Sequence, residues 1–309
     1  MKRPEAQKRG SETGKKAAPS QPADVGYARL QAILEELGSV LVAYSGGVDS
    51  TLLLKVALDT LGPDRAVGLL AQSPSLPARE RQDAIALAER LGARLLTVET
   101  HELSIEEYAR NDEDRCYHCK TAMLEQALGL ARAEELAHVA LGTNADDLQD
   151  HRPGHRAAKE HKVRQPLLEA GLGKAAIREL SLALGLPTWN KPEMACLASR
   201  LPYGFRITAE RLGQVETLEN ALFDLGFRQV RVRHHDEVAR IEVLPGEIAR
   251  LVSQECVAPL VALGRGVGFK YVCVDLQGYR RGALNEGLEL PTGGEEPSRA
   301  PGALGTPKP

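Results

Sequence analysis

Aromatic residues are scarce in this 309-residue sequence, which has one tryptophan, four phenylalanines and seven tyrosines. No apolar run reaches the roughly 20 residues that a membrane-spanning helix needs, and the first residues lack the apolar segment of a signal peptide. We therefore expect a cytoplasmic protein that does not enter a membrane. Positive charge is not in excess either. The net charge is −3, so we expect no nucleic-acid partner.

Cysteine is also infrequent. The chain has five, and an odd number in a protein of this kind favours metal binding or catalysis over disulfide bonds. The sequence contains no internal repeat. Its apolar share of 43% is sufficient for a substantial core, and its length is compatible with two domains.

The stretch with the clearest chemistry is residues 45–50, with the sequence SGGVDS. Apolar residues before it predict a buried strand, and the apolar spacing after it predicts a helix. Asp49 is unexpected in a pure anion site, and a bound cation would explain it. The simpler alternative is a strand–turn–helix junction with serine caps. Glycines that let backbone N–H groups approach a phosphate, and hydroxyl donors at a helix N-terminus, make four residues candidates for phosphate binding: Ser45, Gly46, Gly47 and Ser50.

This stretch resembles the SGGxDS signature of the PP-loop ATP pyrophosphatases. Members of that group activate a substrate by adenylation and release pyrophosphate, so the resemblance implies that ATP is used in this way. The stretch is not a Walker A loop, because it lacks the Gly-Lys-Ser/Thr ending.

Three further apolar segments predict strands that alternate with helices: residues 66–71, expected to be buried, 94–98 and 137–142. This order predicts an α/β fold with a parallel sheet covered on both faces. Ligands of such sheets bind beyond the carboxyl ends of the strands. Polar residues at these ends complete the predicted ATP site: Gln72, Ser73, Gly142, Thr143, Asn144 and Asp146.

Carboxylates at the same edge could hold a magnesium ion that bridges phosphates of ATP. Asp49 and Asp147 are the candidate ligands. Residues 142–147 could instead have no role in binding metal or ATP and form a loop with an Asx turn and a helix N-cap.

Changes in composition divide the chain into four segments. Residues 1–23 and 287–309 have no apolar periodicity and predict disordered tails. Residues 24–192 predict a Rossmann-like parallel sheet of the adenine-nucleotide alpha-hydrolase (PP-loop) type. Residues 193–286 combine helical and alternating strand patterns, which predict a smaller C-terminal α+β domain that binds the substrate.

Cys116 and Cys119 form a CxxC pair, and on a helical turn this spacing places both sulfurs on the same side. Arg115, Lys120 and a helix N-terminus are expected to lower the pKa of these thiols. Cys196 lies far along the chain. The two other cysteines have apolar neighbours and are predicted to be core residues: Cys256 and Cys273.

Three explanations compete for Cys116, Cys119 and Cys196. They could hold an iron–sulfur cluster through three thiolates, which leaves one iron open. They could instead bind a structural zinc, with His118 or an outside residue as fourth ligand. In the third explanation, Cys196 acts alone as a nucleophile or sulfur donor. A third cysteine beside an ATP-activation site favours the two chemical explanations over zinc.

Five motifs occur in a fixed order. They are SGGVDS at residues 45–50, DRCYHCK at 114–120, GTNADD at 142–147, DHRPG at 150–154 and CLASRLPYG at 196–204. Over most of the chain, this series resembles the LarE family of ATP-dependent sulfur transferases in nickel-pincer cofactor synthesis.

The resemblance implies AMP transfer from ATP to a carboxylate of pyridinium-3,5-biscarboxylic acid mononucleotide. Sulfur then replaces AMP and gives a thiocarboxylate. In one branch of the family, the cysteine at the position of Cys196 donates its sulfur and becomes dehydroalanine. In another, three cysteines hold a [4Fe-4S] cluster that carries an extra sulfide. Because this chain has all three, the cluster branch is favoured.

The implied substrate is a small anionic mononucleotide, so arginines that bind phosphate are expected. The candidates are Arg200, Arg231 and Arg233, and the last two alternate to one face of a predicted strand. We also expect a homo-oligomer. The sulfur donor is not identified by the sequence.

Three other functions remain open. A tRNA-thiolating enzyme shares the PP-loop and the cysteines, but it usually has an extended basic face, which is not evident here. An amidotransferase-type ligase such as NAD synthetase would not require the cysteines. The third alternative is a zinc-stabilised, ATP-binding regulatory module that does not turn over substrate.

Overall fold

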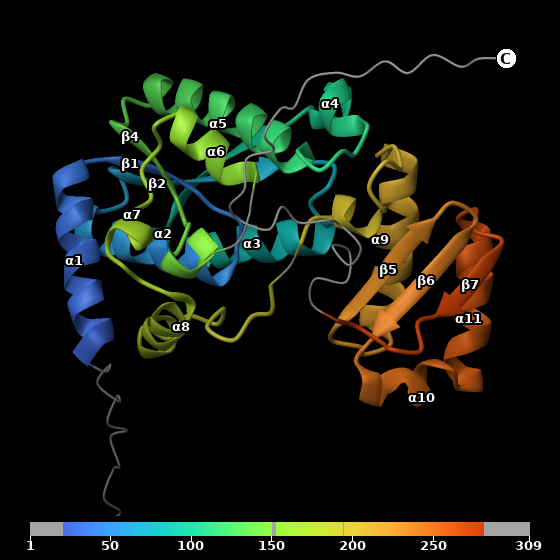
Figure 1. The fold of residues 1–309 in the computed structure, drawn as a ribbon. Helices are drawn as coiled ribbons and strands as arrows, with labels where there is room; N and C mark the ends of the chain where they lie inside the picture. Colours follow the sequence, from blue (N-terminus) through green and yellow to red (C-terminus); the bar gives the residue numbers. More distant parts are fainter. Residues whose placement is uncertain (1–20, 150–152, 194, 281–309) are drawn as a thin grey trace, which may run out of the picture.

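The computed structural model describes residues 21–149, 153–193 and 195–280, which form two parts, each built around a sheet (Figure 1). The first sheet is parallel throughout, with the strand order β3-β2-β1-β4. β1, β2 and β4 are largely buried and rich in Val, Leu and Ala, as expected for a sheet covered on both faces, whereas β3, at the edge of the sheet, has no buried residue. Their bounds are β1 (Val40–Ala43), β2 (Ala66–Gln72), β3 (Arg94–Glu99) and β4 (His138–Leu141).

Helices cover both faces of this sheet, because successive side chains of each strand point to opposite sides. In β1, Val40 and Val42 pack with α1 (Gln21–Leu37), α2 (Val48–Leu61), α3 (Ala78–Arg90) and α8 (Lys174–Ala183). Leu41 instead packs with α5 (Arg115–Ala133) and α6 (Pro153–Glu160). Figure 1 shows α5 and α6 on one side of the sheet and α8 on the other. The predicted Rossmann-like parallel sheet is thus confirmed.

The second part is a three-stranded sheet in the order β5-β6-β7. β5 (Val230–His235) is antiparallel to β6 (Val238–Val243), which is parallel to β7 (Tyr271–Val274). Two helices pack on it in one hydrophobic cluster, α9 (Ala209–Asp224) and α11 (Gln254–Gly266). Thr208 caps α9, because its hydroxyl accepts a hydrogen bond from the backbone N–H of Arg211.

The remaining helical segments are short. Between β3 and α5 lie η1 (Glu102–Ser104) and α4 (Glu106–Ala109), and η2 (Ala145–Gln149) follows β4. The others are α7 (Pro166–Glu169), η3 (Leu197–Arg200), η4 (Pro245–Glu247) and α10 (Ile248–Leu251). No helix among the described residues is long and apolar enough to cross a membrane.

Two expectations about the fold were wrong. The predicted N-terminal tail extends too far, because α1 already begins at Gln21 and buries Ala23 in the core. Cys273 is exposed on β7, the edge strand, whereas Cys256 is buried as predicted. The rest of both predicted tails, and residues 281–286 of the predicted second domain, lie outside the described residues. The predicted boundary after residue 192 falls in the irregular segment that joins the two parts.

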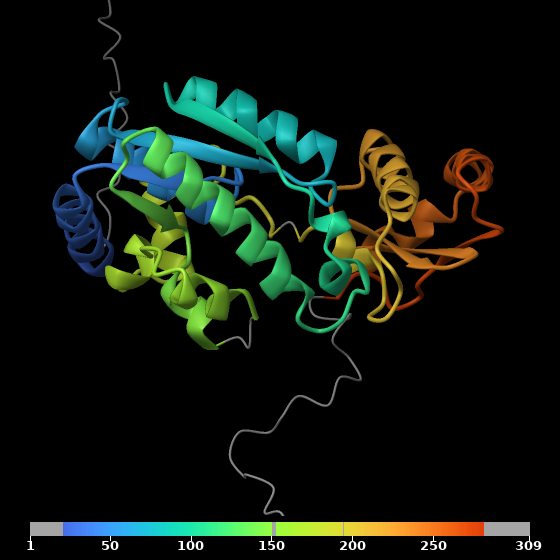
Figure 2. The same ribbon diagram turned by 90° about the horizontal axis from the view of Figure 1, so that it is seen from above.

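Asn111 joins the two parts at a second place. It has a left-handed backbone (φ 64°) and its amide donates to the carbonyls of Pro202 and Phe205 at 2.8 and 2.9 Å. Its own carbonyl accepts from the N–H of Gly204 at 3.1 Å. The start of α5 is therefore fixed against the chain that follows η3, and Figure 2 shows this end of α5 directed toward the second part.

Candidate active site

The phosphate loop at residues 45–50 lies between β1 and α2, as predicted. Gly46 has a left-handed backbone (φ 70°), and a Cβ at this position would come within 2.8 Å of the Cβ of Ala84 in α3. Only glycine fits there without strain. Gly47 is the N-cap of α2, and the hydroxyls of Ser45 and Ser50 lie 3.1 Å apart. The loop therefore has the backbone freedom and the donors that a phosphate site requires.

The loop after β4 packs directly on this helix start. A Cβ at Gly142 would lie 3.0 Å from the backbone nitrogen of Ser50. Asn144 is fully buried, accepts from the N–H of Asp146 at 3.0 Å, and donates its own N–H to Asp147 at 3.0 Å. The Asx turn of the alternative explanation for this loop is present, and it places Asp146 and Asp147 beside the phosphate loop. The neighbouring Thr143 is half-buried.

Asp49 is paired with Lys174, the first residue of α8, and its Oδ2 lies 2.5 Å from Nζ. The same lysine donates its backbone N–H to Asp146 at 2.7 Å. Burial raises the pKa of Asp49, and the hydrogen bond from Lys174 opposes this shift. Asp49 Oδ1 is buried and, among the described residues, has no hydrogen-bond partner. An orphaned carboxylate oxygen beside Asp147 fits a magnesium ion brought in with ATP.

The loop after β2 connects the ATP site to the segment of Cys196. The Oγ of Ser73 accepts from the N–H of Ser75 at 2.9 Å, and it hydrogen-bonds to the buried Glu102. The carbonyl of Ser75 accepts from the N–H of Leu197 at 2.8 Å. Gln72, the last residue of β2, accepts from the N–H of Thr100 at 3.3 Å. Residues 72–75 thus support the cysteine segment from the carboxyl edge of the sheet.

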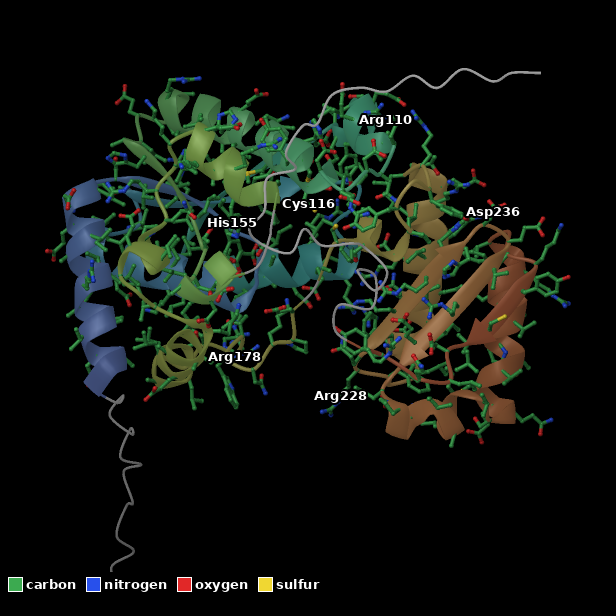
Figure 3. All side chains as sticks on the ribbon, in the orientation of Figure 1. Arg110, Cys116, His155, Arg178, Arg228 and Asp236 are labelled. Carbon is green, nitrogen blue, oxygen red and sulfur yellow. The ribbon has the colours of Figure 1, made fainter. Side chains whose placement is uncertain are left out.

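Two structural elements carry the three cysteines. Cys116 and Cys119 are in the first turns of α5, and Cys119 packs against the hydrophobic cluster of the second part. Cys196 immediately precedes η3, whose Leu197 and Ala198 belong to the same cluster. Figure 3 marks Cys116 near the junction of the two parts. Cys119, Leu197 and Ala198 share this cluster, which brings the start of α5 and the segment of Cys196 together although the cysteines are 77 to 80 positions apart in sequence.

The expected lowering of the thiol pKa values was wrong. Burial raises the pKa of Cys119 to about 12 and also raises that of Cys116, and the charge of Cys196 adds to both shifts. Arg115 and Lys120 do act in the predicted direction, but burial outweighs them. The two thiols are therefore protonated in the protein without a bound metal.

The mutual effects on pKa show that the three thiols are electrostatic neighbours. Within the described part of the chain, no three Cys, His, Asp or Glu side chains are arranged to hold a single metal ion. Cys116 and Cys196 are exposed and Cys119 is half-buried. Three neighbouring thiols at the surface would suit a larger group with thiolate ligands, such as an iron–sulfur cluster.

Arg200 is fully buried and forms a bidentate pair with Glu219 of α9, with both N–O distances at 2.9 Å. Its Nη1 donates to the carbonyls of Ala195 and Cys196 at 2.6 and 2.9 Å. With these contacts, Arg200 holds the backbone at Cys196. Its predicted contact with a substrate phosphate stays a prediction.

Arg231 and Arg233 are both buried on β5, but their surroundings differ. Arg233 forms a bidentate pair with Glu242 of β6 at 2.8 and 3.0 Å. The guanidinium of Arg231 donates, within the described structure, to the carbonyls of Val230 and Glu193. Burial, followed by the charge of Arg200, lowers the pKa of Arg231 to about 10. A bound anion would therefore stabilise the charge of Arg231 more than that of Arg233, which already has a carboxylate partner.

Sequence reasoning missed two lysines next to the phosphate loop. Lys174 pairs with Asp49, and Lys191 donates to the carbonyl of Gly46 at 3.3 Å and to Glu80 at 2.6 Å. Neither belongs to a glycine-rich motif, so no local pattern identified them.

Comparison with known proteins agrees with this geometry. The pyridinium-3,5-bisthiocarboxylic acid mononucleotide synthase of Lactiplantibacillus plantarum is 38% identical over 262 residues, which cover 84% of this chain and 94% of that enzyme. The chain belongs to the LarE family. An uncharacterised protein of Synechocystis sp. is 45% identical over 259 residues, which cover 84% of this chain and 96% of that protein.

The family assignment confirms the predicted ATP-dependent sulfurtransferase class. The profile of the NAD synthase family matches residues 29–145, which include the phosphate loop and β1 to β4. The ammonia-dependent NAD synthetase of Methanosarcina mazei is similar over a shorter region, with 41% identity over 61 residues, or 19% of this chain. The likeness to NAD synthetases is thus a likeness of the ATP-binding part.

Proposed function

We propose that this enzyme adenylates a carboxylate of pyridinium-3,5-biscarboxylic acid mononucleotide and converts it into a thiocarboxylate. The observation that carries the proposal is the hydrogen bond between Leu197 and Ser75, which ties the segment with Cys196 to the loop after β2, at the same carboxyl edge of the sheet as the phosphate loop. An activation site and a sulfur site in contact suit two consecutive reactions on one carboxyl group.

In the first reaction, a carboxylate oxygen of the substrate attacks the α-phosphorus of ATP. The bond from this phosphorus to its bridging oxygen breaks, and pyrophosphate leaves with the electron pair. The phosphate loop holds the nucleotide, and Asp49 with Asp147 would hold the magnesium ion, which neutralises phosphate charge. Lys174 supplies a further positive charge beside the loop.

In the second reaction, sulfur attacks the carbonyl carbon of the acyl adenylate, and AMP leaves with the electrons of its bond to that carbon. Cys116, Cys119 and Cys196 would hold a [4Fe-4S] cluster, and such a cluster supplies an iron to which sulfide can attach. Arg200 fixes the backbone at Cys196 for this step. Arg231 is the proposed contact for the phosphate of the mononucleotide.

Nucleotide analysis tests the proposal. The enzyme should produce AMP and pyrophosphate in equal amounts only when pyridinium-3,5-biscarboxylic acid mononucleotide is present. Deamido-NAD with ammonia, and bulk tRNA, are the comparison acceptors, because NAD synthetase and tRNA thiolation are the rival activities. Pyrophosphate release with either of these, and none with the mononucleotide, would assign a different enzyme. A regulatory module would release none with any acceptor.

Arg231→Met should raise the KM for the mononucleotide about thirtyfold, because loss of a charge-assisted phosphate contact costs on the order of 2 kcal/mol. The KM for ATP should not change. Arg265→Met, at an exposed position on α11, is the matched control. Arg233→Met is less suitable, since it would remove the bidentate partner of the buried Glu242, leave Arg240 as its remaining ion pair, and destabilise the fold. Equal KM values in the Arg231 variant and the control would exclude this phosphate contact.

A further inference from the structure

Among the lysines that the structure describes, Lys174 and Lys191 hydrogen-bond to the phosphate loop or its aspartate. Lys191 lies in the irregular segment between α8 and η3. Its Nζ is 3.3 Å from the carbonyl oxygen of Gly46 and 2.6 Å from Glu80 Oε2. The ammonium group is therefore at the loop where ATP phosphates are proposed to bind.

The backbone of Lys191 is anchored independently of its side chain. Its N–H donates to the carbonyl of Thr188 at 2.9 Å, and its carbonyl accepts from Arg178 at 3.0 Å. The side chain can therefore change partner without moving the chain that carries it. A cavity of about 210 Å³ adjoins Lys191, Glu80 and Leu197, so the pair of Lys191 with Glu80 is not enclosed by protein on that side.

The two partners of Lys191 differ in strength. The carbonyl of Gly46 is a neutral acceptor, whereas Glu80 is a single carboxylate at the start of α3. A bound triphosphate carries several negative charges, so it competes effectively with one carboxylate for an ammonium group. The long, flexible side chain of lysine has the reach for this exchange.

We infer that Lys191 is a phosphate-contacting residue of the ATP site, whose ammonium group leaves Glu80 for the nucleotide. This inference rests on the proposed adenylation. It also gives the ATP site a residue from the segment that carries Cys196, five positions further along the chain. The site for activation is then complete only when the cysteine segment is in place.

Equilibrium binding tests the inference. The probe is α,β-methylene-ATP with Mg²⁺, which cannot be cleaved at the bond that adenylation breaks. Lys191→Met should raise its Kd about tenfold to a hundredfold, the range for a lost charge-assisted hydrogen bond. Adenosine has no phosphate and should bind to both proteins equally. Lys55→Met is the matched control, because Lys55 pairs with Asp59 on α2 at 2.5 Å, away from the loop.

The variant Glu80→Ala shows whether Lys191 contacts phosphate or only holds α3 against the phosphate loop. If Lys191 contacts phosphate, removal of its competing carboxylate should leave the Kd of the analogue unchanged or lower it. If Lys191 only ties α3 to the loop, Glu80→Ala and Lys191→Met should weaken binding equally, which would overturn the inference. Lys191→Arg keeps the charge and should bind within about threefold of the original protein.

Two further outcomes are distinguishable. Unchanged binding in Lys191→Met, with normal binding in the original protein, would overturn the inference and leave the proposed function intact. No binding of the analogue to the original protein would contradict the proposed function, and the inference would fail with it. Thermal unfolding of each variant shows whether a weaker Kd reflects loss of the fold.

Discussion

Asp49→Asn should reduce pyrophosphate release with ATP and the mononucleotide by about a hundredfold or more, because it removes the negative charge proposed to hold magnesium at the phosphates. The amide has the shape of the carboxylate, so the phosphate loop and α2 should remain folded. The orphaned Oδ1 and the pair with Lys174 indicate that this position is built for charge.

The same helix provides the control. Asp59 pairs with Lys55 at 2.5 Å, the same distance as in the pair of Asp49 with Lys174, but it lies at the exposed end of α2. Asp59→Asn should leave pyrophosphate release unchanged, since exposed ion pairs contribute little. If Asp49→Asn and Asp59→Asn release pyrophosphate equally, the phosphate loop does not take part in the reaction.

Replacing any one of Cys116, Cys119 or Cys196 by alanine should abolish formation of the thiocarboxylate, while pyrophosphate release continues. The physical reason is that each thiolate would supply one of three bonds to a shared cluster. Cys273→Ala is the matched control, because Cys273 is exposed on the edge strand β7 and should be dispensable.

Two measurements accompany these variants and separate the two sulfur routes. After anaerobic purification, the original protein should contain about four iron atoms and four sulfides per chain, and each of the three variants should contain fewer. With added sulfide, the original protein should complete many turnovers, and its mass should stay constant. The sacrificial route predicts instead that Cys116→Ala stays active and that the original protein loses about 34 Da at Cys196, the mass of hydrogen sulfide. That combination would replace the cluster route with the sacrificial one.

The raised pKa values of two of the thiols affect how a cluster would be loaded. Because the pKa values of Cys116 and Cys119 are raised, both thiols must lose a proton before they can bind iron. Arg115 and Lys120 offset part of this cost. Loading of a cluster would therefore be coupled to proton release.

Local patterns were sufficient for much of the fold and part of the site. The apolar segments before and after residues 45–50 determine a strand and a helix, because their periods depend only on neighbouring residues. Gly46 could be identified from the sequence as a candidate of the phosphate loop, because its left-handed backbone depends only on the local turn. The i, i+3 spacing of Cys116 and Cys119 likewise fixes their common side on α5.

Only the tertiary structure decided which charges act together. Arg231 and Arg233 are alike in sequence, and the register of β5 and β6 places Glu242 opposite Arg231, yet the carboxylate of Glu242 pairs diagonally with Arg233. The pKa of Cys119 is raised by burial and by nearby negative charge, and the groups responsible come together only in the folded protein. Lys191 reaches Gly46 across 145 positions of sequence, a contact that only the packing of the joining segment against the phosphate loop creates.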